Sequence, residues 1–250
     1  MRSVLFDICF YGFTTLWAAG LLFTIPLPGR EALARGIVLY ARIVFWLARV
    51  IAGIRIEIRG QEHLPRGDAA LIVAKHMSYL DPIVGFYLMP NMTALAKKEL
   101  FAIPFIGTIL RKLGIVRVDR QAGTAHQVMP DVVRRIKAQR RPLIVYPEGT
   151  RARPGARLKL KSGAFYLQLD GSLPVIPMAT NSGLHWPKGS MTRRPGTVIY
   201  EIGPPLPHLT DKAAFMAEVE RRVIDRSEEL MRADPVYHEA VGAVAAETSH

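Results

Sequence analysis

Residues 71–82 read LIVAKHMSYLDP, and they predict a strand, a loop and a helix in succession. The apolar run Leu71–Ala74 has the length and composition of a buried strand. Asp81 and Pro82 predict the start of a helix, because aspartate is a favoured N-cap and proline suits the first helical position. The loop between strand and helix can bring His76 and Asp81 together, as a pair in which the carboxylate orients the imidazole as a base. A capping aspartate beside an incidental loop histidine would leave the same pattern.

Short apolar segments alternate with helical patterns after residue 53. Ile54, Ile56 and Ile58 alternate with charged residues, as in a half-buried strand. Further strands are expected at residues 70–74, 93–96, 115–118, 143–146, 175–178 and 198–202, and helices at 82–89, 128–137, 162–169 and 211–232. Strands that alternate with helices are typical of an α/β domain. We therefore expect a mixed sheet flanked by helices over residues 53–233, and a frayed tail over residues 234–250.

The residues before 53 have a different, largely apolar composition. Residues 8–25 are 18 consecutive positions without a charge, which just reaches the length of a membrane-spanning helix. The turn sequence PLPG follows at residues 26–29, and a second apolar run covers residues 36–54. Two apolar segments joined by a turn predict a helical hairpin over residues 1–52 that associates with a membrane.

The second apolar run carries Arg35, Arg42 and Arg49 at seven-residue intervals, which places them along one helix face. Arginine is costly at the centre of a bilayer, so this stripe favours a hairpin that dips into one leaflet and keeps its arginines at the interface. One full span followed by an interfacial helix is the second interpretation. A cleaved signal peptide, with ALA at residues 32–34 as its cleavage signal, is the third.

The chain is strongly basic, with 33 Lys and Arg against 21 Asp and Glu and a net charge of +12. Such an excess indicates an anionic partner: nucleic acid, an acidic membrane surface or a phosphorylated substrate. Half of the residues are apolar, which excludes a mainly disordered chain. The single cysteine, Cys9, excludes an intrachain disulfide and a cysteine-based zinc site. The sequence has no P-loop, no GxGxxG, no GxSxG nucleophile elbow and no HExxH motif.

Two polar turns follow predicted strands. GIVRVDR at residues 114–120 ends in Arg120, just past a strand end, where the guanidinium fork suits a phosphate. A solvated strand-end arginine fits the same pattern. YPEGTR at residues 146–151 contains Gly149, which lets backbone amides approach a ligand, and Arg151, the first residue of a basic run. An ordinary polar turn is the alternative there.

A short apolar segment bracketed by prolines, LPVIPM, lies at residues 173–178. Proline suits the ends and edges of strands, so the segment predicts a strand at a pocket wall or at the rim of the sheet. It carries no chemistry of its own, and a plain core strand is the simpler interpretation.

Taken in this order, the four motifs resemble those of the glycerolipid acyltransferase family, and specifically its 1-acylglycerol-3-phosphate acyltransferases. That family carries H-x4-D, G-I/V-x-x-I/V-D/R-R, F/Y-P-E-G-T-R/S and a proline-bracketed strand, here at residues 76–81, 114–120, 146–151 and 173–178. The resemblance covers residues 70–180, and NSGLHWP at 181–187 and RPGT at 194–197 extend it toward bacterial members. One departure is Lys75, which stands where the family often has asparagine before the motif histidine.

The resemblance implies acyl transfer from a fatty acyl thioester to the 2-hydroxyl of lysophosphatidic acid, giving phosphatidic acid in phospholipid biosynthesis. It implies that His76 is the general base and that Asp81 orients it. The other implied residues bind the glycerol phosphate, namely Lys97, Arg120 and Arg151, or shape the acceptor site, namely Glu148, Gly149 and Thr150. No metal or organic cofactor is implied, and the acyl donor is acyl-CoA or acyl carrier protein.

An anionic lipid substrate agrees with the basic charge and the apolar N-terminal segment. We expect the protein to bind an anionic phospholipid membrane at the cytoplasmic face of the inner (plasma) membrane, because the Lys and Arg excess favours that side. No nucleic-acid partner is expected, since no base-reading motif or aromatic platform occurs. The alternatives are an acyltransferase for another lysolipid such as a lyso-ornithine lipid, a membrane-bound esterase, and a non-catalytic membrane-tethered lipid-binding protein.

Overall fold

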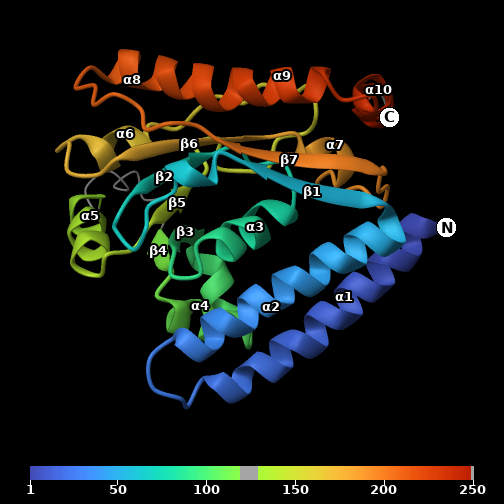
Figure 1. Ribbon diagram of the computed structural model, residues 1–250, viewed down its shortest axis with the longest axis horizontal. Coiled ribbons are helices and arrows are strands. Elements are labelled where there is room, and N and C mark those ends of the chain that lie inside the picture. The colour runs from blue at the N-terminus through green and yellow to red at the C-terminus, as the bar shows by residue number, and fades with distance from the viewer. Residues whose placement is uncertain (119–128, 249–250) are drawn as a thin grey trace.

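The computed structural model describes residues 1–118 and 129–248, which form a seven-stranded sheet between two layers of helices (Figure 1). The strands are β1 Ile54–Arg59, β2 Leu71–Ala74, β3 Thr93–Lys97, β4 Val116–Val118, β5 Leu143–Val145, β6 Val175–Thr180 and β7 Gly196–Ile202. Their order across the sheet is β1-β7-β6-β2-β5-β3-β4. Neighbouring strands are parallel except β6 and β7, which run antiparallel. The predicted mixed sheet flanked by helices is confirmed.

The helices alternate with these strands as expected. They are α1 Arg2–Leu21, α2 Glu31–Leu47, α3 Leu80–Leu88, α4 Ile106–Leu113, α5 Met129–Ala138, α6 Gly163–Gln168, α7 Ser182–His185, α8 Lys212–Val219, α9 Arg226–Arg232 and α10 Tyr237–Thr248. Shorter helical segments are η1 Leu22–Thr24, η2 Ala48–Ala52, η3 Gln61–His63, η4 Lys98–Ala102 and η6 Glu220–Asp225.

Each face of the sheet has its own apolar core. On one face, Ile72 of β2 packs in a cluster with residues of α1, α2 and α3. On the other face, Leu71 and Val73 of β2 pack in a cluster with residues of α5, α6 and α8. Alternate side chains of a strand point to opposite faces, so β2 serves both cores and is buried along its whole length. This position explains why β2 is apolar throughout, and it places the loop after β2 at the centre of the sheet's carboxyl edge.

The proline-bracketed strand β6 lies inside the sheet, between β7 and β2, and is buried throughout, so the interpretation as a plain core strand is confirmed and a position at the rim is wrong. On the β2 side, Leu71 N donates to Pro174 O and Lys75 N donates to Met178 O. The nitrogen of Pro177, which carries no hydrogen, faces the opposite side of β6, where β7 pairs with β6 only from Met178 onward. The proline therefore interrupts no hydrogen bond between these strands.

The N-terminal helices α1 and α2 form a hairpin that lies against the sheet domain (Figure 1). Phe6 and Phe10 of α1 are buried, and each meets the Trp186 ring edge-on with ring centroids 4.8 Å apart. Asp7 forms an ion pair with Arg193, 2.6 Å between Oδ1 and Nη2, and both residues are buried. The first half of α1 therefore belongs to the same core as the sheet.

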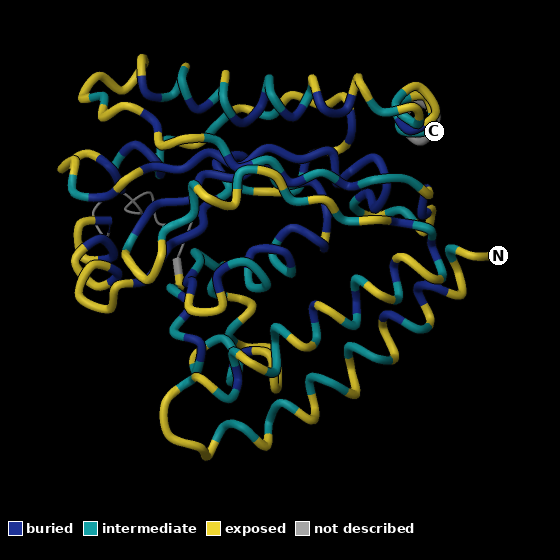
Figure 2. The backbone as a smooth tube through the Cα atoms, viewed as in Figure 1, coloured by how far each residue is buried: buried dark blue, intermediate teal, exposed yellow. Residues whose placement is uncertain are grey.

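The rest of the hairpin is mostly exposed or half-buried (Figure 2), and many of its exposed residues are large and apolar. Among the described residues, Arg2–Thr24 is the one helix long and apolar enough to cross a membrane, with a mean hydropathy of 1.5. The large apolar side chains that the hairpin exposes are Val4, Leu5, Ile8, Tyr11, Leu16, Phe23, Leu27, Leu39, Trp46 and Val50. Such a surface is typical of a protein that associates with a membrane.

Most of the tail after residue 233 is helical, so the prediction of a frayed tail is wrong. Asp234 accepts a hydrogen bond from the buried His185, with Oδ2 and Nε2 3.0 Å apart. In α10, Ala240 is buried and Glu239 accepts from Arg194 Nε at 2.9 Å. These partners lie in a distant segment of the chain, so the local alanine-rich composition carries no signal of the docking.

Candidate active site

His76 and Asp81 lie together at the carboxyl end of β2, as the sequence predicts. His76 Nδ1 and Asp81 Oδ2 are 2.8 Å apart. The Asp81 side chain is fully buried, whereas 19% of the His76 side chain is exposed. An ionised carboxylate only accepts hydrogen bonds, so Nδ1 is the donor and Nε2 carries the imidazole lone pair. The pair therefore presents an accessible nitrogen base.

Asp81 accepts four further hydrogen bonds. Its Oδ2 accepts from Met77 N at 2.7 Å and Ser78 N at 2.8 Å. Its Oδ1 accepts from Ser182 Oγ at 2.6 Å and Tyr200 OH at 2.8 Å. Burial by itself raises the pKa of Asp81, but the imidazole and these donors outweigh it and hold the pKa below the ordinary 3.8. The carboxylate is therefore ionised and fixed in one orientation.

The prediction that Asp81 is the N-cap of the following helix is wrong. α3 begins at Leu80, with Tyr79 in the N-cap position and no side-chain cap. Asp81 instead turns back to the amides of the preceding loop, and Ser78 Oγ accepts from Leu80 N at 3.1 Å. A buried carboxylate needs several donors at once, and the loop, α7 and β7 supply more of them than a helix terminus would.

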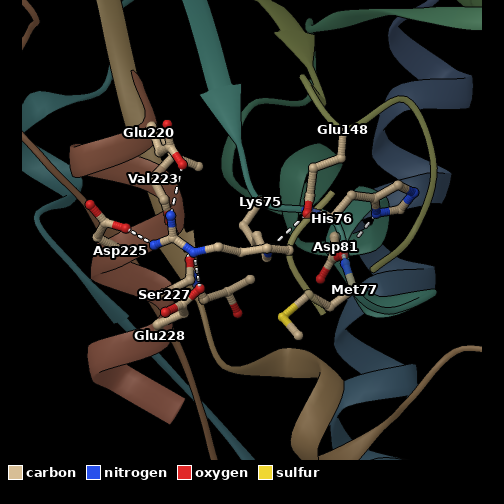
Figure 3. A network of polar contacts seen from close by, with 12 residues as sticks. Lys75, His76, Met77, Asp81, Glu148, Glu220, Val223, Asp225, Ser227 and Glu228 are labelled. Carbon is tan, nitrogen blue, oxygen red and sulfur yellow. Dashed lines mark hydrogen bonds and ion pairs between the residues drawn. The ribbon is translucent and has the colours of Figure 1, made fainter. Parts of the chain in front are cut away.

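A buried ion pair lies beside the His–Asp pair (Figure 3). Lys75 Nζ and Glu148 Oε1 are 2.6 Å apart, and their side chains are 1% and 0% exposed. Glu148 Oε2 also accepts from His76 N at 3.1 Å. The expectation was that Glu148 shapes the acceptor site, but its carboxylate faces inward. It joins the YPEGTR turn to the loop of His76, and Ala152 N adds a second link by donating to His76 O at 2.8 Å.

The YPEGTR turn also holds the imidazole ring in place. The Tyr146 ring stacks on the His76 ring, with centroids 4.1 Å apart and planes inclined by 21°. Burial raises the pKa of the Tyr146 hydroxyl well above its ordinary value, so the phenol stays neutral. Gly149 has φ of +69°, in the left-handed region that favours glycine, so another residue in this turn would be strained.

Arg151 presents an unsatisfied donor. Its guanidinium carbon lies 3.8 Å from the centroid of the Tyr79 ring, which fixes the plane of the guanidinium. Its Nη1 is buried and has no hydrogen-bond partner in the part of the chain that the structure describes. A buried donor without an acceptor is unfavourable, and an anionic ligand would satisfy it.

The remaining predicted residues lie around this centre or outside the described residues. Thr150 Oγ1 accepts from Lys188 Nζ at 3.2 Å. Lys97 is exposed at the end of β3, which runs parallel to β5 and β2, so it lies on the same edge of the sheet as His76. Arg120 lies outside the described residues.

Arg157, in the basic run that begins at Arg151, has a structural role. Arg157 makes ion pairs with Glu220 at 2.7 Å, with Glu228 at 2.9 Å and with Asp225. The three acids lie on η6 and α9 (Figure 3). This cluster fastens the loop that follows the YPEGTR turn, so the basic run does not act as a single ligand-binding unit.

Sequence reasoning misses the two hydroxyls that hold Asp81. Ser182 is 101 residues away from Asp81 along the chain, and Tyr200 is 119 residues away. No local pattern links residues so far apart. The available signal is that Ser182 lies in NSGLHWP at residues 181–187 and that Tyr200 lies in the predicted strand after it.

Comparison with known proteins agrees with this site. Residues 55–181 match the model of the family described as Acyltransferase. A 1-acyl-sn-glycerol-3-phosphate acyltransferase from Pseudomonas aeruginosa is 30% identical to this chain, over 89% of the chain and 87% of that relative. The chain belongs to the acyltransferase family. A Limnanthes douglasii protein of the same description is 35% identical over 77% of this chain and 69% of its own length.

The fold of this acyltransferase matches a solved structure. The crystal structure of the 1-acyl-sn-glycerophosphate (LPA) acyltransferase PlsC from Thermotoga maritima superposes with a TM-score of 0.75 at 24% identity. The match covers 92% of this chain and 98% of that one. The family region at residues 55–181 contains β1 through β6, whereas Ser182, Tyr200 and the N-terminal hairpin lie outside it.

Proposed function

We propose that this acyltransferase moves a fatty acyl group from a thioester to the 2-hydroxyl of lysophosphatidic acid and so forms phosphatidic acid. The observation that carries the proposal is the 2.8 Å contact between His76 Nδ1 and the buried Asp81, which leaves Nε2 as the free base. The names of the Pseudomonas and Limnanthes relatives support the same acceptor.

In the proposed reaction, His76 Nε2 takes the proton of the 2-hydroxyl as that oxygen attacks the thioester carbonyl carbon. The tetrahedral intermediate then collapses, the C–S bond breaks, and the departing thiolate takes the proton back from the imidazolium. Asp81 stays ionised throughout and stabilises the positive charge of the ring. No metal or organic cofactor has a part in this proposal, and either acyl-CoA or acyl carrier protein serves as donor.

Arg151 is the proposed ligand of the acceptor's phosphate, together with Lys97 and Arg120. The stacked guanidinium with its unsatisfied Nη1 supports this role for Arg151. Lys97 supports it by position, because it ends a strand at the same edge of the sheet as His76. Gly149 and Thr150 shape the backbone beside the guanidinium.

We propose direct transfer without an acyl-enzyme. The two serines that contact Asp81 both have hydroxyls that are already hydrogen-bonded: Ser182 Oγ donates to Asp81, and Ser78 Oγ accepts from Leu80 N. Cys9 lies on the N-terminal helix α1. This arrangement speaks against the esterase alternative, which needs a nucleophile activated by His76.

The hairpin is the proposed anchor, held within one leaflet at the cytoplasmic face of the inner membrane. Phe6, Asp7 and Phe10 are buried against the sheet domain, which favours a retained hairpin over a cleaved signal peptide and over a helix that crosses the bilayer alone. The Arg35, Arg42 and Arg49 stripe supports a position at an anionic lipid interface.

The deciding assay supplies the purified protein with lysophosphatidic acid and, in separate reactions, acyl-CoA and acyl carrier protein thioesters. We expect phosphatidic acid with wild type and about 10²–10⁴-fold slower formation with His76→Ala. Transfer to a lyso-ornithine lipid in place of lysophosphatidic acid would establish the alternative acceptor. Binding of lysophosphatidic acid with no transfer from either donor would establish the non-catalytic lipid-binding alternative.

A further inference from the structure

The segment formed by η4 and the start of α4 exposes a cluster of large apolar side chains, here called the η4–α4 patch. Its members are Leu100, Ile103, Phe105 and Ile106, which are 40%, 42%, 61% and 43% exposed. The patch belongs to neither the His–Asp site nor the hairpin. Contiguous exposed apolar side chains of this kind mark an interaction surface more often than they occur by chance.

The backbone at the centre of the patch is strained. Phe105 has φ of +65° and ψ of −52°, and Ile106 N donates to Pro104 O at 2.7 Å. These values define the rare, strained type of γ-turn, and a bulky residue at positive φ is an outlier in its own right. The turn points an aromatic side chain into solvent, where it gains nothing that would offset the strain. An apolar environment outside the protein would supply that gain.

The helix that begins in the patch, α4, contacts the turn of the α1–α2 hairpin. Lys112 of α4 donates from Nζ to Ile25 O at 3.1 Å and to Leu27 O at 2.6 Å, both in that turn. Phe23 and Leu27 at the same turn are 83% and 48% exposed. Figure 1 shows the hairpin turn and α4 on the same side of the sheet, opposite α8 and α9, and Figure 2 shows the exposed surface of both.

The exposed charged residues between positions 97 and 111 are two cations, Lys97 and Arg111, and one acid, Glu99, so the net charge beside the patch is positive. Lys97 precedes η4 and is exposed, and Arg111 on α4 is also exposed. Arg35 and Arg42 of the hairpin line an open cavity between α2 and the loop that precedes β3, about 910 Å³ in volume. Cations that ring an apolar centre suit phosphate headgroups around inserted apolar side chains.

We propose that the η4–α4 patch is a second membrane-inserting surface, which enters an anionic bilayer beside the turn of the hairpin. The inference rests on the membrane association in the proposed function and adds a second, separate contact to it. Two contacts fix the tilt of the sheet domain on the membrane. They bring the carboxyl end of β3, with Lys97, to the level of the lipid headgroups.

The test measures partition of the full-length protein into vesicles of phosphatidylcholine with and without phosphatidylglycerol. We expect the double variant Phe105→Ser with Ile106→Ser to bind the anionic vesicles roughly tenfold more weakly than wild type, through lost apolar burial. The control is Leu169→Ser, because Leu169 is 44% exposed but lies at the end of α6, on the other face of the sheet. Equal partition of the double variant and the control would overturn the proposal.

A second variant, Phe105→Gly, separates lipid binding from folding. Glycine relieves the strain at positive φ, so its thermal unfolding midpoint should equal or exceed that of wild type while vesicle binding falls. A fall in the midpoint with unchanged vesicle binding would assign Phe105 a structural role and overturn the proposal. Acylation of lysophosphatidic acid in detergent micelles tests the proposed reaction separately, and we expect both sets of variants to keep it.

Discussion

Glu148→Gln removes the negative charge from the buried ion pair and leaves the Lys75 ammonium without a counter-charge. Because both side chains are at most 1% exposed, water cannot take the place of the lost carboxylate. Breaking a buried pair from one side costs about 3–5 kcal/mol of unfolding free energy. The glutamine oxygen can still accept from His76 N, so the neutral hydrogen bond, worth about 1 kcal/mol, is the smaller term. With about 2–4 °C per kcal/mol for a domain of this size, the unfolding midpoint should fall by roughly 6–20 °C.

Thermal and urea unfolding of the detergent-solubilised protein measure this loss. The double variant Lys75→Met with Glu148→Gln buries no charge at this place. Its loss of unfolding free energy should therefore be about 1–3 kcal/mol smaller than the sum of the losses of the two single variants. The control is Asp68→Asn. The Arg140–Asp68 pair has the same 2.6 Å separation, but its side chains are 71% and 65% exposed, so no measurable change is expected. Strict additivity of Lys75→Met and Glu148→Gln would refute the reasoning.

Three further predictions concern the site itself. His76→Ala should lower turnover by about 10²–10⁴-fold while the unfolding midpoint stays near wild type, and a covalent acyl-protein trapped with donor alone would contradict direct transfer. Arg151→Gln should lower the rate of acylation of lysophosphatidic acid by about ten- to a hundredfold, since a charged hydrogen bond is worth about 1.5–3 kcal/mol. An equal loss of rate with an uncharged monoacylglycerol would mean that the arginine has a structural role. Tyr200→Phe and Ser182→Ala each remove a donor from Asp81 and should raise its pKa. The folded-state pKa lies below 3.8, so this group contributes stability above its unfolded pKa that is lost as pH falls through the folded value. A pH series of unfolding midpoints should therefore show that loss at a higher pH in both variants than in wild type, and coincident curves would exclude the role of these hydroxyls.

The strands and the His–Asp pair could be predicted because their causes are local. Leu71–Ala74 is apolar at every position since both faces of the central strand are buried. His76 and Asp81 meet because a short loop between strand and helix leaves them few other arrangements. Ile54, Ile56 and Ile58 likewise lie on the more buried face of β1, and the charged residues between them lie on the exposed face.

The remaining features depend on distant parts of the chain. The apolar composition of β6 agrees with its place in the core, but the way the sheet accommodates Pro177 depends on β7, which pairs with β6 only from Met178 onward. In the sequence, Lys75 stands out only as a departure from the family pattern. Its role in a buried ion pair depends on Glu148, 73 residues further along the chain. The docking of the tail depends in the same way on His185.

The contacts of α1 with the sheet domain can form only late in the synthesis of the chain. Phe6, Asp7 and Phe10 leave the ribosome first, but their partners Trp186 and Arg193 follow only after some 180 further residues, with Asp7 and Arg193 separated by 186 positions. At synthesis rates of about 5–20 residues per second, that interval is roughly 10–40 s. During this time α2 can already pack on the second half of α1 through Tyr40, but the face of α1 that carries Phe6, Asp7 and Phe10 has no protein surface to cover it. With the proposed membrane anchor, a bilayer is the nearest apolar surface for this face of the helix, so we expect the helix to associate with lipid before the sheet domain closes over it.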